Sequence, residues 1–193
     1  YDFDHENWGF SREKEEAWGS YFSRMRNHPA WGTKNIVAWD VSVQGARNMN
    51  SLCTANPNIY YFSYVTSNTL LDSSSNRHVP DKSMSYIIRA NARLMGMKKA
   101  YYDDGSETDS TWFENDGIVN KKSMLGPTTG INGPDPIGNY RENDILIPGQ
   151  WYVMGEYKSD HRKFVGHSIS KNEYNELIKT YIRHLSLLWT LPK

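Results

Sequence analysis

The stretch IYYFSYVT at residues 59–66 is dense in aromatic and β-branched side chains, the residue types that are enriched in strands. A turn-forming Asn56-Pro57-Asn58 precedes it. Towards the other end of the chain, residues 151–157 and the shorter stretch 145–147 have the same character on either side of Pro148-Gly149. The sequence therefore predicts strands over 59–66, 145–147 and 151–157, with a long segment between the first and the others.

Helical patterns alternate with these strands. Ser170 and Glu173 have the spacing of a capping box, and apolar residues recur behind them with a helical period as far as Trp189. Further helices are expected over residues 11–27, with a Ser11 cap and an end at Pro29; over 42–53, with a Ser42 cap; and over 84–95, with Gly96 as its C-cap. Residues 71–81, 101–111 and 126–138 are expected to be loops. The order helix, helix, strand, helix, strand, helix predicts the α/β class.

The charge balance narrows the class of partner. The chain has 193 residues, with 22 Lys plus Arg against 22 Asp plus Glu, and a formal net charge of +0. This balance gives no support for binding to nucleic acid or to an anionic membrane through bulk charge. No stretch approaches the roughly 18 apolar residues of a membrane span, so we expect no transmembrane segment.

The apolar content is low. It is 38%, against about 45–50% in typical domains. The first figure counts the 13 Tyr and the second counts Gly, of which this chain has 14, so the two definitions nearly agree. We therefore expect a folded chain that lacks part of its hydrophobic core. The start at Tyr1, without a methionine, has the character of a processed or internal start, and it favours a fragment of a longer chain.

Sulfur and histidine patterns exclude two kinds of site. The single cysteine, Cys53, cannot form an intramolecular disulfide or a thiolate metal site. None of the six histidines has a partner at the spacing of a strong metal motif such as H-E-x-x-H. His184 lies within the last predicted helix, where we expect a surface or edge residue.

Two residues are candidates for acid–base chemistry. His161 follows the predicted strand 151–157 and a short polar stretch, and loops at strand ends often carry catalytic groups. Asp116 lies in the segment ENDGIV, residues 114–119, for which the ordinary interpretation is an Asp-Gly turn between apolar runs. The order Asp before His is that of α/β-hydrolase triads, in which Ser comes first.

No serine of this chain has the surroundings of the triad nucleophile. The G-x-S-x-G pattern does not occur. Residues 166–170, GHSIS, begin like such an elbow, but Ser170 stands where the second glycine is required, and its bulk would block the tight strand-to-helix turn. The segment also follows His161, which is the wrong order for this fold.

Several segments together resemble the secreted triacylglycerol lipases of the staphylococcal and Geobacillus type, which are α/β-hydrolases. They occur in family order across nearly the whole chain. The matching segments are Tyr1-Asp2-Phe3 with Trp8-Gly9, Tyr21-Phe22 with Trp31, residues 39–43 with Gly45-Ala46, Asn56-Pro57-Asn58 with Tyr60-Tyr61, residues 112–120 with Met124 and Gly126-Pro127, and Met154-Gly155 with Asp160-His161.

The resemblance implies that residues 1–193 are the C-terminal half of one α/β-hydrolase domain, with a mostly parallel sheet flanked by helices and incomplete as a single chain. It also implies that Asp116 is the triad acid and His161 the triad base. The serine elbow and the oxyanion hole then belong to an N-terminal half that is absent here, which is the expected partner. The implied reaction is hydrolysis of triacylglycerol or other carboxylic esters at an oil–water interface, by a secreted enzyme that is inactive without that half.

The resemblance also raises the question of metals. Lipases of this type bind calcium through acidic side chains two and seven residues after the triad histidine and through a carbonyl before the middle helix. In this sequence these positions are Lys163, Ser168 and Ser83, and a charged lysine cannot ligate a hard cation. The zinc-binding Asp of these lipases corresponds to Asn35, a poorer ligand. We therefore expect neither calcium nor zinc.

Two other functions remain open on the sequence alone. An aromatic-rich surface built from the seven Trp and 13 Tyr would suit a non-catalytic module that binds lipid or carbohydrate, although most such residues are core or half-buried. The chain could also be a catalytically dead homologue of the lipases. A second chain that carries G-x-S-x-G would favour the hydrolase over both.

Overall fold

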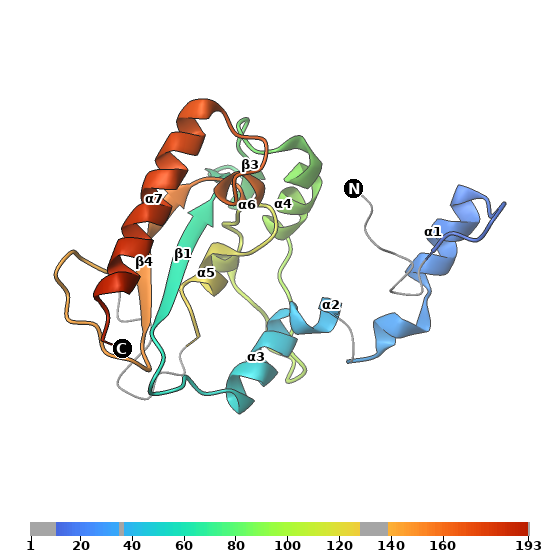
Figure 1. Cartoon of the computed structure of the whole chain (residues 1–193). Helices are drawn as coiled ribbons and strands as arrows, with labels where there is room; N and C mark the ends of the chain where they lie inside the picture. Colours follow the sequence, from blue (N-terminus) through green and yellow to red (C-terminus); the bar gives the residue numbers. More distant parts are fainter. Residues whose placement is uncertain (1–10, 35–36, 128–138, 193) are drawn as a thin grey trace. The chain divides into compact units, whose positions relative to one another are not determined.

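The computed structural model describes residues 11–34, 37–127 and 139–192 (Figure 1). The chain forms two compact units, Tyr1–Met49 and Asn50–Lys193. Among the described residues, no helix is both long enough and apolar enough to cross a membrane. Part of the loop expected over 126–138, namely 128–138, and the Asn35 position lie outside the described residues.

The first unit consists of short helices. They are α1 (Trp18–Arg26), the 3-10 helix η1 (Pro29–Gly32), α2 (Val37–Asp40) and the beginning of α3 (Val43–Leu52). The Ser42 cap of α3 is confirmed, since Ser42 Oγ accepts a hydrogen bond from the Gly45 N–H at 3.0 Å. A side chain at Gly45 would collide with the Trp39 carbonyl, whose oxygen lies 2.0 Å from the position of a Cβ.

The predicted start of the first helix at Ser11 is wrong. The helix α1 begins at Trp18, with Ala17 as its N-cap. Glu15 has φ +69°, a conformation that does not belong to a right-handed helix. Arg24, within α1, donates from Nε and Nη2 to the two carboxylate oxygens of Glu16, at 2.9 and 2.7 Å. This bidentate bond lowers the pKa of Glu16, and the same guanidinium donates to the Ser11 carbonyl at 2.8 Å.

Two parallel strands form the centre of the second unit. They are β1 (Tyr61–Ser67) and β4 (Trp151–Lys158), which pair side by side (Figure 1). The register shifts between Ser63 and Val65, because β4 has one more residue than β1 over this interval. Gly155, at φ +137°, lies in this bulge, where a conformation rare for other residues is required. The strands predicted at 59–66 and 151–157 are confirmed, whereas residues 145–147 form no strand.

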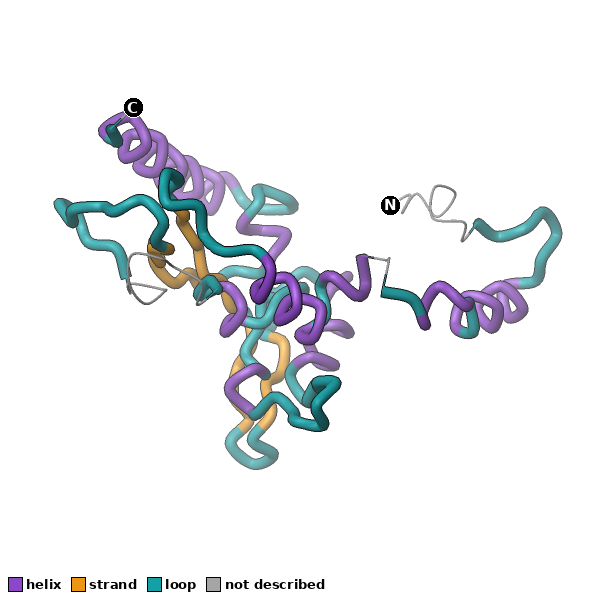
Figure 2. Tube along the Cα trace, turned by 90° about the horizontal axis from the view of Figure 1, so that it is seen from below, coloured by secondary structure: helices purple, strands orange, loops and turns teal. Residues whose placement is uncertain are grey.

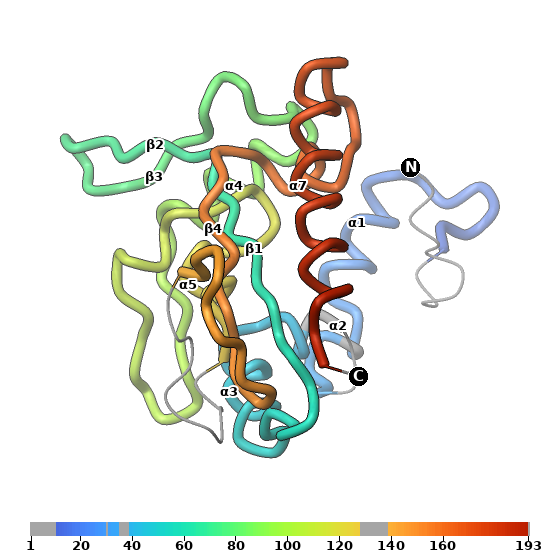
Figure 3. The backbone as a smooth tube through the Cα atoms, turned by 60° about the vertical axis from the view of Figure 1, so that its left-hand side comes forward, coloured from blue at the N-terminus to red at the C-terminus, as the bar shows by residue number. Residues whose placement is uncertain are grey.

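The loop predicted over residues 71–81 is instead a hairpin. Strand β2 (Thr69–Asp72) pairs antiparallel with β3 (Arg77–Pro80), and the two lie together in Figure 3. The connecting turn is held by Asp72, whose carboxylate accepts bonds from Ser74 and Ser75. Asn76 adopts the left-handed conformation, at φ +52°. The polar composition of the turn masked two short strands on either side of it.

The two strand pairs are orange in Figure 2, and the remaining elements of the second unit are helices. The helix predicted over 84–95 is η2 (Tyr86–Ile88) followed by α4 (Arg89–Met95), and its Gly96 C-cap is confirmed. The others are η3 (Ser110–Trp112), α5 (Lys121–Met124), α6 (His161–Phe164) and α7 (Lys171–Thr190). The capping box at Ser170 and Glu173 is present as predicted. The combination of helices with a parallel pair of strands confirms the α/β class.

The hydrophobic core is small, as the composition predicts. One buried cluster consists of Met84, Ile88 and Ala92. The long helix α7 lies alongside β1 and β4 (Figures 1 and 3), yet none of its residues is buried. Leu185 is 63% exposed and Trp189 is 82% exposed. An apolar stripe of α7 is thus open in this chain.

Candidate active site

Asp116 lies in a tight, buried turn between η3 and α5. Its side chain is fully buried. Carboxylate oxygen Oδ1 accepts hydrogen bonds from the backbone N–H groups of Ile118 and Val119, at 3.0 and 2.8 Å. Gly117 closes the turn at φ +97°, and a Cβ there would lie 2.6 Å from the Ile88 side chain. The Asp-Gly turn expected at this position is therefore real, and it points a carboxylate into the interior.

Asn115 anchors this turn to its surroundings. Its buried side chain donates to the carbonyls of Phe113 and Ala92, at 2.8 and 3.1 Å, and accepts from the Gly117 N–H at 2.9 Å. Every polar group of the amide thus has a partner, as buried amides require. Sequence reasoning assigned Asn115 no role, although its place beside Asp116 in the matched segment was the available signal.

Lys121 ties the same turn to the parallel strands. Its ammonium lies 3.3 Å from a carboxylate oxygen of Glu114 and 2.8 Å from one of Glu156 on β4. These carboxylates raise the pKa of Lys121, with the hydrogen bond to Glu156 as the largest cause. The backbone N–H of Lys121 also donates to the Glu114 carbonyl at 2.8 Å. The segment 114–121 is therefore closed at its base and fastened to β4.

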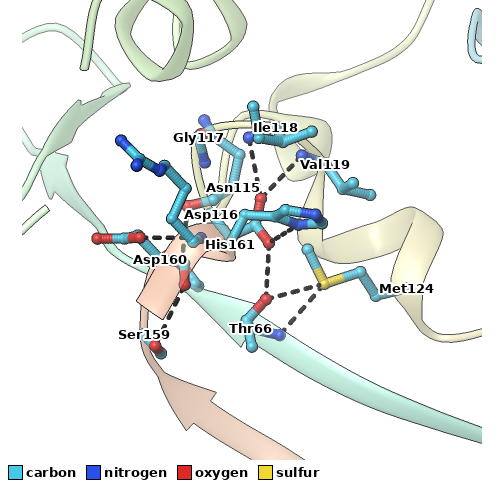
Figure 4. A network of polar contacts seen from close by, with 12 residues as sticks. Thr66, Asn115, Asp116, Gly117, Ile118, Val119, Met124, Ser159, Asp160 and His161 are labelled. Atoms are coloured by element: carbon cyan, nitrogen blue, oxygen red, sulfur yellow. Dashed lines mark hydrogen bonds and ion pairs between the residues drawn. The ribbon is translucent and has the colours of Figure 1, made fainter. Parts of the chain in front are cut away.

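The His161 ring faces the Asp116 carboxylate (Figure 4). Its ring Nδ1 lies 2.9 Å from Asp116 Oδ2. Its backbone N–H donates to the Asp116 carbonyl oxygen at 3.0 Å. The His161 side chain is 44% exposed, whereas that of Asp116 is not exposed at all. Because Nδ1 faces the buried carboxylate, Nε2 is at the opposite end of a ring that reaches the surface. The structure thus brings together the two residues predicted as acid and base.

Asp160 adjoins His161 in sequence but has other bonds. Its carboxylate is the N-cap of α6, where it accepts from the N–H groups of Arg162 and Lys163, both at 3.0 Å. It also accepts from the Ser85 N–H at 2.8 Å and from Ser85 Oγ at 3.0 Å. These four bonds occupy about all the acceptor positions of a carboxylate. Asp160 holds the helix that begins at His161 and does not bond to its ring.

Thr66 is a further member of this network that sequence reasoning missed. It lies near the carboxyl end of β1, and its hydroxyl donates to Asp116 Oδ2 at 2.8 Å. It is 4% exposed. The only signal in the sequence is its position at the end of a predicted strand.

A pocket of about 160 Å³ lies against the Asp116–His161 pair. Its remaining walls are mainly apolar and come from β1, α5, α6 and the Asp116 turn, namely Tyr64, Thr66, Val119, Met124, Phe164 and Val165. Burial raises the pKa of Tyr64 to about 12, so its hydroxyl stays neutral. The His161 ring thus borders a small cavity with little competing charge.

The side chains at two positions that correspond to calcium ligands have other partners. The Lys163 ammonium is held 3.0 Å from Glu173 Oε1. The Ser168 hydroxyl lies 2.7 Å from His167 Nδ1. In the described part of the chain, no three His, Cys, Asp or Glu residues are grouped as a metal would need.

His184 is the histidine of α7. It packs edge-on against the rings of Phe62 and Tyr64, at centroid distances of 5.2 and 5.5 Å. Burial lowers its pKa. It is half-buried between helix and strand, which matches the edge position expected for it.

Comparison with known proteins gives one consistent result. A family model described as lipase-like, C-terminal domain, matches residues 1–186. The lipase of Staphylococcus hyicus is 27% identical over 184 residues, which are 95% of this chain and 26% of that protein. Lipase 1 of Staphylococcus aureus (strain NCTC 8325 / PS 47) is 26% identical over 187 residues, which are 96% of this chain and 25% of that protein.

Two solved structures superimpose on most of this chain. EstA from Clostridium botulinum superimposes with a TM-score of 0.65 at 30% identity, over 91% of this chain and 42% of that one. The crystal structure of Staphylococcus hyicus lipase gives a TM-score of 0.63 at 25% identity, over 98% of this chain and 47% of that one. The chain thus spans about a quarter of the curated relatives and less than half of each solved structure.

Proposed function

Because the chain belongs to the family of lipase-like C-terminal domains, we propose that Asp116 and His161 are the acid and the base of a Ser-His-Asp triad for ester hydrolysis. The observation that carries this proposal is the 2.9 Å contact between His161 Nδ1 and the buried Asp116 Oδ2. A carboxylate in this position holds the imidazole in the tautomer with its proton on Nδ1. The lone pair of Nε2 is then free to accept a proton.

The nucleophile comes from outside this chain, which contains no G-x-S-x-G. In the proposed reaction, a serine hydroxyl supplied by an N-terminal half attacks the ester carbonyl while His161 Nε2 takes its proton. His161 returns that proton to the departing alcohol, and an acyl-serine forms. Water then attacks the acyl group in the same way and releases the carboxylic acid and the free serine. The N-terminal half also supplies the oxyanion hole, so the 193 residues alone are inactive.

The proposed fold of the assembled enzyme is an α/β-hydrolase. Both β1 and β4 point their carboxyl ends at the site, since Thr66 lies near the end of one and His161 follows the other. Ligands of open parallel sheets bind at that edge. The staphylococcal relatives are named lipases, which supports acylglycerol as the substrate class. Action at an oil–water interface and secretion are part of the same proposal.

The test joins this chain to the serine-containing N-terminal segment of a relative, by fusion or by co-expression, and measures hydrolysis of emulsified tributyrin. We expect turnover that His161→Ala abolishes, and no turnover from this chain alone. Hydrolysis that survives His161→Ala would overturn the proposal. Binding to the emulsion without hydrolysis in any assembled form would favour a lipid-binding module, and a folded, inactive assembly that does not bind would favour a dead homologue.

A further inference from the structure

We infer that Thr66 is a positioning residue for the triad base, because its hydroxyl fixes the carboxylate oxygen that His161 uses. This inference rests on the proposed function for its catalytic consequence, whereas the contact itself is independent of it. Thr66 Oγ1 lies 2.8 Å from Asp116 Oδ2, and His161 Nδ1 lies 2.9 Å from the same oxygen (Figure 4).

The surroundings of Thr66 leave its hydroxyl one strong acceptor. The second neighbour of Oγ1 is the Met124 sulfur, at 3.5 Å, and a thioether is only a weak acceptor. The same sulfur lies 3.2 Å from the Thr66 backbone nitrogen and accepts its N–H. Because the sulfur accepts the backbone N–H of Thr66, the Thr66 hydroxyl donates to the stronger acceptor, the Asp116 carboxylate.

This bond completes the set of donors around Asp116. An ionised carboxylate has about four lone-pair sites. On Oδ1 they are filled by the N–H groups of Ile118 and Val119, and on Oδ2 by Thr66 and His161. Thr66 occupies one lone pair of Oδ2 and leaves the other for the imidazole. Without the hydroxyl, the ring Nδ1 of His161 is the one remaining donor to Oδ2 in the described part of the chain, so Oδ2 loses its fixed, strand-borne partner.

The position of Thr66 makes this support rigid. Thr66 lies within the parallel pair, where its Cα is opposite that of Tyr157 on β4. The helix that carries His161 is held separately, by Asp160 and Ser85. Loss of the Thr66 hydroxyl is therefore expected to misdirect the carboxylate without releasing α6, which distinguishes positioning from general support of the fold.

The experiment compares three variants of the assembled enzyme. Thr66→Val removes the hydroxyl at nearly constant volume, and Thr66→Ser keeps it. Thr108→Val is the matched control, since Thr108 is also 4% exposed and its hydroxyl accepts from the Ala100 N–H at 2.9 Å, outside the site. A hydrogen bond to a charged group is worth about 10- to 100-fold, so we expect Thr66→Val to lower kcat by about that factor with little change in KM. Thr66→Ser should recover most of kcat, and Thr108→Val should keep it.

A second measurement does not depend on catalysis. In the assembled protein with or without substrate, the Nδ1 proton of His161 should give a far-downfield NMR resonance in the parent and in Thr66→Ser, and this signal should move upfield or vanish in Thr66→Val. If Thr66→Val does not fold, Thr66→Ala removes the hydroxyl without adding bulk. An unchanged resonance, or a Thr66→Ser variant as impaired as Thr66→Val, would overturn the inference. If turnover survives His161→Ala, the proposed function fails, and the resonance alone decides the role of Thr66.

Discussion

His161 is joined to Asp116 twice, since its backbone N–H donates to the Asp116 carbonyl at 3.0 Å and its ring Nδ1 lies 2.9 Å from the Asp116 carboxylate. The first bond fixes the position of the His161 backbone, and the second fixes the orientation of its ring. A residue held at both points loses little freedom when substrate binds, which favours catalysis by orientation.

The two neighbouring aspartates should differ sharply when each is changed to asparagine in the assembled enzyme. Asp116→Asn should cut kcat by a factor of about 10⁴, because an amide stabilises the wrong imidazole tautomer. Asp160→Asn should lower the melting temperature but cost far less in kcat per folded molecule, because Asp160 caps α6 and bonds to Ser85. Near-UV circular dichroism of each variant gives the folded fraction. Equal losses in the two variants would contradict the assignment.

Calcium should not stabilise this protein. A ligand that binds only the native state adds about 2.7 kcal/mol at 100 times its Kd, which would be visible in a melting curve. Here the Lys163 ammonium, paired with Glu173, stands at a position that would need a carboxylate. The expected melting temperature is the same in millimolar calcium and in chelator, and a rise of several degrees with calcium would refute this. Lys163→Asp combined with Ser168→Asp is the matched gain-of-binding variant.

Gly117→Ala should damage the site through two separate effects. The residue has φ +97°, and its new Cβ would also lie 2.6 Å from the Ile88 side chain. Gly105→Ala is the control, because Gly105 has φ +82° but nothing within 4 Å of a Cβ. We expect Gly105→Ala to cost about 1 kcal/mol in the free energy of unfolding, as backbone strain alone does, and Gly117→Ala to cost more and to reduce turnover. Denaturant unfolding of the assembled enzyme measures the difference, and equal costs would exclude the clash.

The chain by itself should associate. The strand β1 has a single partner, β4, among the described residues, and α7 exposes Ile182, Leu185 and Trp189. Open sheet edges and apolar patches of this kind promote aggregation. Light scattering of the isolated chain should show large species, and co-expression with the N-terminal segment should remove them. A monodisperse isolated chain that melts cooperatively would contradict this.

Local signals were enough to predict part of the fold. The helix α7 begins at Lys171 with Ser170 as its N-cap, as predicted, because a capping box involves only residues three apart. The same kind of signal failed at Ser11, because Glu15 has φ +69° and α1 begins at Trp18, with Ala17 as its N-cap. The hairpin of β2 and β3 was missed because its turn is polar and its strands have four residues each.

In the candidate site, too, some residues could be predicted from the sequence and others could not. Asp116 and His161 were identified through matched segments and their order in the chain. Thr66 and Asn115 were not, because their contacts join residues far apart in the sequence. The Thr66–Asp116 bond spans 50 positions and the Asn115–Ala92 bond spans 23. Pairing over such distances depends on the folded topology, which no short window of sequence contains.

The four-residue helix α6 has a consequence for the order of folding. A helix of this length is not stable by itself in water, so His161 takes its place only when Asp160 finds Ser85, 75 positions away, and when the ring finds Asp116, 45 positions away. Contacts of large sequence separation form at the expense of loop-closure entropy and tend to come late. We expect His161 to reach its place among the last parts of the molecule, so that a half-folded intermediate has no histidine positioned for proton transfer.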